Sequence, residues 1–202
     1  MNGKHQPVEK HPLAPFLPKR ARILMLGSFP PKKEKWSMEF FYPNWINDMW
    51  RIWGLIFFSD KEHFTASGSD GMPARRFDRS KCVSFASDKG IAMYDTAYEV
   101  IRQKDNASDK FLEVVTPTDL DRLLDEIPEC KAIVTTGQKA ADIIADTFGC
   151  KEPKVGEYTE CLAGKDRTIR FWRMPSSSRA YPLALEKKAE YYRKMFETEG
   201  II

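Results

Sequence analysis

Three short segments of the chain carry residue types that could bind a small polar ligand and act on it. In residues 24–31 an apolar run stops abruptly at Gly27, which a serine, a phenylalanine and two prolines follow. The second segment contains Asn47, in the sequence Asn-Asp-Met-Trp, and the third, residues 174–179, reads Met-Pro-Ser-Ser-Ser-Arg. Asparagine and serine side chains donate and accept hydrogen bonds, and a glycine turn lets backbone amides approach a ligand closely. The three segments therefore predict a site if the fold brings them together.

The elements around these segments predict how the fold would position them. Short apolar runs that end at turn residues predict buried strands, at residues 23–26, 91–94 and 132–136. An alternating pattern predicts a further strand and a partner for it, at 168–174 and 161–163. Apolar residues at helical spacing predict helices, at residues 46–57, 120–127, 140–148 and 185–196. Strand and helix alternate, so we expect an α/β fold, a three-layer sandwich with a mainly parallel central sheet, whose ligands bind at the carboxyl ends of the strands.

The remaining stretches predict less regular structure. Residues 1–21 contain four prolines and many charges, which predicts an irregular N-terminal arm before a single domain formed by residues 22–202. Residues 65–81 are rich in glycine, serine and charge and predict a mobile loop, whereas residues 97–103 predict a helix.

The helix near residue 46 could be capped by Asn44, because asparagine accepts hydrogen bonds from the unpaired amides of a first turn. Asn47 would then lie in that first turn, where side chains lean toward the helix N-terminus and the helix dipole favours negative charge. Asn47 could hold a water molecule with its carbonyl or donate with its amide. The alternative is an asparagine that only caps the helix.

Composition and charge narrow the function classes. Hydrophobic residues make up 42% of the 202 residues, enough for a sizeable core. The net charge of +3 and the pI of about 8.6 are mildly basic, below the pI above ~9 of a strongly electrostatic DNA binder. We expect no membrane association, because no apolar run approaches the ~18 residues of a spanning helix and no signal peptide is recognisable.

Histidines, cysteines and glycines exclude several mechanisms. The three histidines lie outside the three segments and beside no nucleophile, which argues against Ser-His-Asp and Cys-His catalysis. The four cysteines form no Cys-x-x-Cys pair, and neither a nucleophile elbow nor a phosphate-binding P-loop is present. A few unclustered cysteines fit a reducing cytosol. We expect a cytoplasmic protein that needs no metal and no cofactor.

Taken in order, the three segments resemble the uracil-DNA glycosylase superfamily, and most closely its mismatch-specific and hypoxanthine/uracil branches. Those branches have a strand ending in Gly-x-x-Pro, an aromatic stretch leading to Asn-x-aromatic-Trp, and a late Pro-Ser loop. Here the corresponding residues are Gly27 to Pro30, the stretch from Phe41 to Asn47, and Pro175 with the serines that follow. The similarity spans roughly residues 22–197.

The resemblance implies a monofunctional DNA glycosylase, which flips a deaminated base out of the duplex and hydrolyses its N-glycosidic bond in base-excision repair. The partner would be damaged DNA, and we expect a monomer. The resemblance implies catalytic roles for Asn47 and Ser28. It implies contacts to the flipped base from Gly27, Phe29, Phe41, Tyr42 and Asp95. It implies contacts to DNA from Pro175, Ser176, Ser177, Ser178 and Arg179.

Two residues depart from the pattern of the superfamily. Many members place Asp or Asn two residues after the first glycine, where it positions water, but this chain has Phe29. Several branches have His or Asn where this chain has Met174, which cannot donate a hydrogen bond to a leaving base. Asn47 would then carry more of the chemistry, and backbone amides, Ser176 or Ser177 would stabilise the leaving base.

Other interpretations of the same residues remain open. Tyr42 could stack on a base or pack in the core, and Asp95 could bind water or cap a following helix. A non-catalytic nucleic-acid binding protein on the same fold would explain the two departures. An α/β enzyme acting on nucleotides or sugars would also use loops at the ends of strands.

Overall fold

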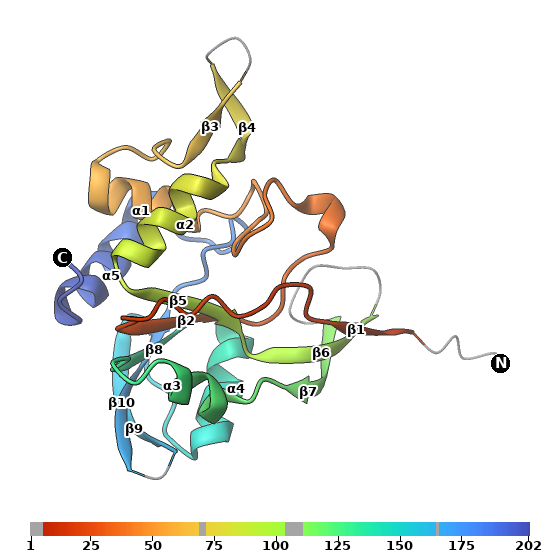
Figure 1. Ribbon diagram of the computed structural model, residues 1–202, viewed down its shortest axis with the longest axis vertical. Helices are drawn as coiled ribbons and strands as arrows, with labels where there is room; N and C mark the ends of the chain where they lie inside the picture. The colour runs from red at the N-terminus through yellow and green to blue at the C-terminus, as the bar shows by residue number, and fades with distance from the viewer. Residues whose placement is uncertain (1–5, 69–71, 104–110, 165) are drawn as a thin grey trace.

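A five-stranded sheet lies at the centre of the protein, whose computed structural model describes residues 6–68, 72–103, 111–164 and 166–202 (Figure 1). The strand order is β5-β2-β8-β10-β9. Neighbours pair in parallel from β5 to β10, and β9 pairs antiparallel with β10. The bounds are Ile23–Gly27 for β2, Ile91–Asp95 for β5, Ala132–Thr136 for β8, Glu157–Ala163 for β9 and Arg167–Met174 for β10. The three strands β2, β5 and β8 are almost entirely buried, which explains their unbroken apolar sequences.

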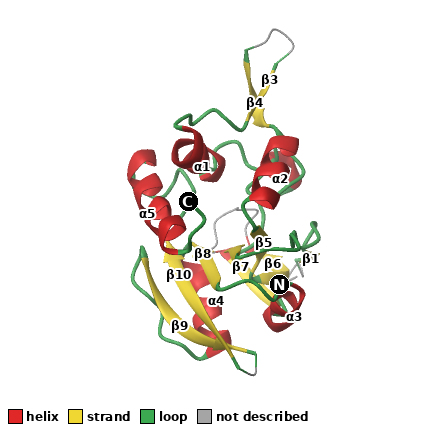
Figure 2. Cartoon of the chain, turned by 60° about the vertical axis from the view of Figure 1, so that its left-hand side comes forward, coloured by secondary structure: helices red, strands yellow, loops and turns green. Residues whose placement is uncertain are grey.

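The described residues form five α-helices, which flank the central sheet. Their bounds are Met49–Phe58 for α1, Arg79–Asp88 for α2, Leu120–Glu126 for α3, Gln138–Phe148 for α4 and Leu185–Thr198 for α5. Helices α1, α2 and α5 lie on one side of the sheet, and α3 and α4 lie on the other (Figures 1 and 2). A short 3₁₀ helix, η1, covers Lys33–Lys35. The expected α/β class is therefore confirmed, and none of the helices in the described ranges is long and apolar enough to cross a membrane.

A second sheet corrects two predictions. It has the order β1-β6-β7, with β1 at Val8–Lys10, β6 at Ala97–Arg102 and β7 at Leu112–Pro117. Residues 97–103 were expected to form a helix, but β6 pairs antiparallel with β1 and β7. The burial along β6 nearly alternates, as expected for a strand with one covered face. The N-terminal arm is also not irregular throughout, because β1 belongs to this sheet and Phe16 forms a bridge with Met93 of β5.

The expected loop at residues 65–81 is a hairpin followed by a helix. β3 covers Thr65–Ser67 and β4 covers Pro73–Phe77, and α2 begins two residues later. The hairpin projects from the body of the protein beside α2 (Figure 1). Its base is anchored by Phe64 and Phe77, which are both buried. The two strands are too short for periodicity to reveal them, and residues 69–71 of the expected loop lie outside the described residues.

Two of the four cysteines are joined by a disulfide, a pairing that their spacing in the sequence did not predict. Cys150 follows α4 and Cys161 lies in β9, and their Cα atoms are 5.8 Å apart. The residues are separated by 11 positions, and packing of α4 close to β9 brings them together. Cys82 and Cys130 are free and buried, and burial raises the pKa of Cys130 to about 11. That thiol therefore stays protonated near neutral pH.

Candidate functional site

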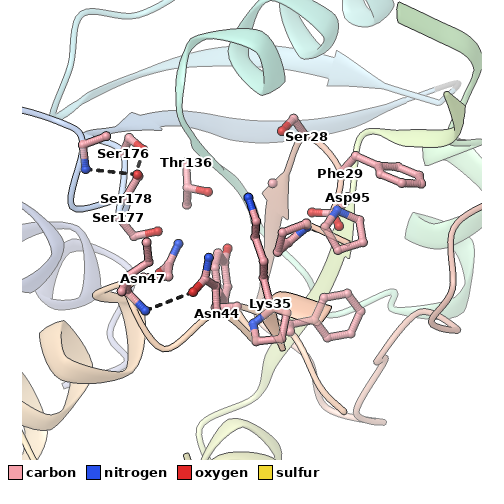
Figure 3. A pocket seen from close by; sticks show the side chains of 18 of the residues that line it. Ser28, Phe29, Lys35, Asn44, Asn47, Asp95, Thr136, Ser176, Ser177 and Ser178 are labelled. Carbon is pink, nitrogen blue, oxygen red and sulfur yellow. Dashed lines mark hydrogen bonds between the residues drawn. The ribbon is translucent and has the colours of Figure 1, made fainter. Parts of the chain in front are cut away.

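A cavity of about 820 Å³ lies at the carboxyl ends of β2, β5 and β8 (Figure 3). The three segments singled out in the sequence meet here, although they are far apart along the chain. The lining comes from residues 27–31, from the stretch between Phe41 and Asn47, and from Ser176–Ser178. Such a position is expected for ligand binding in a parallel sheet, and the volume is typical of small-molecule sites.

Most of the residues expected in the site line this cavity. They are Gly27, Ser28, Phe29, Phe41, Tyr42, Asn47, Asp95, Ser176, Ser177 and Ser178. Pro175 and Arg179 are not among the described lining residues. The carbonyl of Pro175 accepts a hydrogen bond from the hydroxyl of Tyr192 at 2.9 Å, and Met174 beside it is buried. Both residues therefore help to hold in place the loop that follows them, Ser176–Ser178, which we call the serine loop.

Helix α1 begins later than expected, which changes the role of Asn44. The carbonyl oxygen of the Asn44 side chain accepts from the amide of Ile46, within a turn that precedes the helix. Asn47 lies just before α1, and its Oδ1 accepts from the amide of Met49 at 2.9 Å. Asn47 is thus the residue whose side chain satisfies a first-turn amide. Because Oδ1 faces Met49, the Nδ2 amide group is the part of Asn47 left to donate to a ligand.

The serine loop is fastened to the start of α1 through backbone contacts. Asn47 and Ser178 form an isolated antiparallel bridge, and the amide of Asp48 donates to the carbonyl of Ser177 at 2.8 Å. Ser178 is further held by its own amide, which donates to the Ser176 hydroxyl at 3.2 Å. These contacts place the expected DNA-binding loop beside Asn47, as Figure 3 shows.

Four charged side chains lie beside the contact between the serine loop and the start of α1: Asp48, Arg51, Arg179 and Lys188. We call them the Asp48 cluster. Asp48 accepts from Arg179 Nε at 2.8 Å and lies 3.5 Å from Lys188 Nζ. Lys188 also donates to the carbonyl of Ser178 at 2.8 Å. Burial lowers the pKa of Lys188, and the charge of Asp48 opposes that effect. Arg179, the residue expected to contact DNA, donates from Nε to Asp48 while 46% of its side chain stays exposed.

The aromatic residues of the lining are fixed by their packing. Tyr42 has a positive φ of 52°, an unusual backbone conformation for a tyrosine. Its hydroxyl oxygen is buried, and burial raises the pKa of Tyr42 well above its ordinary value, so the phenol stays neutral. Its ring contacts Trp53 edge-on at 6.5 Å, and Phe41 packs edge-on against Tyr94. Both rings belong to the core and also border the cavity.

Asp95 contacts a histidine that the sequence analysis did not connect with it. No helix follows it, because Thr96 leads directly into β6, so the interpretation of Asp95 as a helix cap is wrong. Its Oδ2 lies 2.8 Å from Nε2 of His11, which comes from the N-terminal segment. Sequence reasoning missed this histidine because 84 residues separate the two and no local pattern links them. Phe29 contacts the same imidazole edge-on at 5.4 Å.

Further lining residues were also not anticipated. Lys35 of η1 lies at the cavity, as do Thr136 at the end of β8 and Tyr181 after the serine loop. Of the described lining residues, Lys35 is the cation and Asp95 the carboxylate. Figure 3 shows Asn47 and Ser176–Ser178 at one side of the cavity, and Ser28, Phe29 and Asp95 at the other. Among the described residues no group of three or more His, Cys, Asp or Glu side chains could hold a metal ion.

Comparison with solved structures identifies a protein of similar fold. It is described as a "putative Uracil DNA glycosylase" from Methanosarcina acetivorans, solved by NMR in solution. The TM-score is 0.58 at 19% sequence identity, and the alignment covers 94% of this chain and 99% of that one. No protein-family model matches the sequence, and neither does any curated protein. The similarity supports a common fold.

The arrangement has the parts that cleavage of a polar, planar ligand requires. Asn47, the serines and the turn after Gly27 supply hydrogen-bond donors, and the aromatic rings supply flat apolar surface. Asp95 supplies a carboxylate, and Lys35 supplies positive charge at the cavity. Asn47 and Ser176–Ser178 at one side, and the Asp95 carboxylate beside the turn after Gly27 at the other, could act on the two ends of a bond that breaks with separation of charge.

Proposed function

We propose that this protein is a monofunctional DNA glycosylase that hydrolyses the N-glycosidic bond of a deaminated base, uracil or hypoxanthine. The observation that carries the proposal is the meeting of residues 27–31, Asn47 and Ser176–Ser178 in one cavity. The similarity of fold to a protein described as a "putative Uracil DNA glycosylase" supports it. The target base would be flipped out of the duplex, because its glycosidic bond is inaccessible within the stack.

In the proposed reaction, negative charge develops on the departing base and positive charge on the sugar. The Nδ2 amide of Asn47 would donate to a carbonyl oxygen of the base, and the turn at Gly27 and Ser28 would donate at the base edge. Tyr42, or Phe41 in its place, would stack on the base, a contact worth about 1–3 kcal/mol. The cavity would also separate the reacting bond from bulk water.

The serine loop would bind the DNA backbone around the flipped nucleotide. Ser176–Ser178 would contact phosphates through hydroxyls and amides, which fixes register without reading sequence. Lys35 would add an electrostatic contact at the cavity. Arg179 and Pro175 would act through the loop, because Arg179 is paired with Asp48 and the Pro175 carbonyl with Tyr192. We infer that the protein acts as a cytoplasmic monomer on a three-layer, mainly parallel α/β scaffold.

A non-catalytic nucleic-acid binding protein is the second candidate. It is favoured by Phe29, which offers no polar group to water, and by Met174, which is 1% exposed and lies outside the described lining. It also fits the bond between Asn47 Oδ1 and Met49, which is the bond of a capping residue. Such a protein would bind DNA in a salt-dependent way and release no base.

Incubation with uracil- and hypoxanthine-containing duplexes, followed by alkaline strand scission, separates these two functions. Strand breaks at the modified position would support the glycosylase. Salt-dependent binding without breaks would support the binding protein. Turnover of free nucleosides or nucleotides without action on DNA would instead favour the third class, an α/β enzyme for small molecules.

A further inference from the structure

Asp95, the last residue of strand β5, lies beside the point where the neighbouring strand β2 ends and the chain turns along the cavity. Gly27 and Asp95 are register partners on the parallel pair β2 and β5. Oδ1 of Asp95 lies so close to the Gly27 backbone that a Cβ at residue 27 would collide with it. Asp95 is 8% exposed and lines the cavity. The glycine thus leaves room for a carboxylate beside the turn of residues 27–31.

The second oxygen of this carboxylate is held by His11. Nε2 of the imidazole lies 2.8 Å from Oδ2 of Asp95, and the imidazole is completely buried. A carboxylate accepts hydrogen bonds and donates none, so Nε2 is the donor. Nδ1 lies 2.8 Å from the carbonyl oxygen and 3.2 Å from the amide nitrogen of Leu13. Both ring nitrogens therefore have partners, and the ring has one defined orientation.

The N-terminal segment that carries His11 is held to the body of the protein by backbone and side-chain contacts at residues 8–11. The amide of His11 donates to the carbonyl of Tyr98 at 2.8 Å, and β1 pairs with β6 just before it. Glu9 accepts from Arg102, whose guanidinium also donates to the Pro30 carbonyl at 3.1 Å. The segment therefore supports both Asp95 and the turn of residues 27–31.

A buried histidine and carboxylate cost free energy to remove from water, and apolar side chains could fill the same space without that cost. Oδ2 of Asp95 accepts the hydrogen bond from His11. The other oxygen, Oδ1, lies beside the turn of residues 27–31, which lines the cavity. Asp95 is also the carboxylate among the described lining residues, whereas Phe29, Asn47 and the serines cannot act as bases near neutral pH. The site therefore has one group suited to accept a proton from water.

We propose that Asp95 is the catalytic base of this site and that His11 is the positioning residue that orients its carboxylate. The inference rests on the proposed function, hydrolysis of an N-glycosidic bond. Oxygen of a water molecule bonds to C1′ of the sugar while the C1′–N bond breaks and its electron pair leaves with the base. One proton of that water passes to Oδ1 of Asp95. The departing base takes a proton from solvent, and Asp95 later returns its own proton to solvent.

The test compares three variants of the full chain, Asp95→Asn, His11→Phe and His11→Gln, with the wild type. The probe is a duplex with the base that the wild type releases, and the readouts are the single-turnover rate constant and the Kd for that duplex. Asp95→Asn keeps the shape but removes the base, so the rate constant should fall at least ~10²-fold. The Kd should change by less than about threefold, because the proposed role concerns the reaction and not binding.

The two histidine variants separate orientation from packing. Phenylalanine keeps an aromatic ring against Tyr94 but cannot donate to Asp95, so His11→Phe should slow the reaction about tenfold or more. The Nε2 amide of glutamine can donate where the imidazole did, so His11→Gln should recover most of the rate. Thermal unfolding checks that each variant is folded.

Several outcomes would overturn the inference. A wild-type protein that releases no base removes the proposed function and this inference together. Release by the wild type with an unchanged rate for Asp95→Asn removes Asp95 as the base but leaves the proposed function standing. Equal rates for His11→Phe and His11→Gln, whether slow or fast, remove the positioning role. If Asp95→Asn does not fold, the histidine pair decides, since recovery by glutamine is expected only if the orientation of Asp95 matters.

Discussion

Asn47 and Ser178 form an antiparallel bridge that joins the residue before α1 to the serine loop after β10. The bridge connects two of the three motifs found in the sequence, although more than a hundred residues separate them. It places a side-chain amide next to three hydroxyl groups at the edge of the cavity. A change on either side of the bridge should therefore affect both the chemistry and the hold on DNA.

Asn47 should contribute to catalysis and to stability through different atoms. Asn47→Ala loses both the donor and the bond to the Met49 amide, so the rate of base release should fall about 10²–10³-fold. The free energy of unfolding should fall by about 1 kcal/mol. Asn47→Asp is the matched control, because its carboxylate still accepts from Met49 but cannot donate. It should be as slow as the alanine variant and nearly as stable as the wild type. A fully active Asn47→Asp would remove the amide from the mechanism.

Buried members of the Asp48 cluster should contribute more to the free energy of unfolding than exposed members. Asp48→Ala leaves Lys188 buried, at 1% exposure, without its counter-charge, and should cost about 3–5 kcal/mol in urea unfolding. Arg179 is partly exposed, so Arg179→Ala should cost less than about 1 kcal/mol. Equal losses for the two variants would show that burial does not control the energetics of the cluster.

Lys35 should contribute to DNA affinity mainly through charge. Lys35→Ala should weaken binding and reduce the slope of log K against log salt by about 1, as expected when one phosphate contact is lost. Lys151→Ala is the control, because Lys151 follows the end of α4 that runs away from the cavity. It should leave the slope unchanged. The same slope for wild type and Lys35→Ala would place the DNA elsewhere.

His63 should make the stability depend on pH in the acidic range. Its ring stacks on Phe58 with centroids 3.5 Å apart, and burial together with the charge of Lys81 lowers its pKa below 6.5. The unfolded chain then binds the proton more tightly, so the free energy of unfolding falls as the pH drops below 6.5 and levels off below the folded pKa. His63→Gln should lose less stability than the wild type between pH 7.5 and 5. Parallel curves would contradict this prediction.

The parallel strands and the cavity they form could be predicted from local sequence. Strands β2, β5 and β8 are buried on both faces, so each appears as an apolar run that ends at a turn. The carboxyl ends of such strands meet at one edge, which brings together Gly27 and Asp95 among the ten expected site residues that line the cavity. Their roles in the reaction remain predictions.

The parts that sequence reasoning missed depend on contacts between distant residues. β6 has polar and apolar residues in an order that also fits a helix, and its partners β1 and β7 decide its structure. His11 lies among prolines and charges and gains meaning only beside Asp95. Helix α1 begins at Met49 and not near residue 46, a difference that the local sequence does not reveal because Asn44 and Asn47 each accept from a backbone amide two residues ahead.

Release of free base from a panel of duplexes tests the central claim most directly. Each duplex holds one uracil, hypoxanthine, xanthine or thymine opposite each normal base, and the free base is measured by chromatography under single turnover. We expect release of uracil or hypoxanthine by the wild type, and loss of that release in the folded Asn47→Asp variant. A folded wild-type protein that releases no base from any duplex would contradict it.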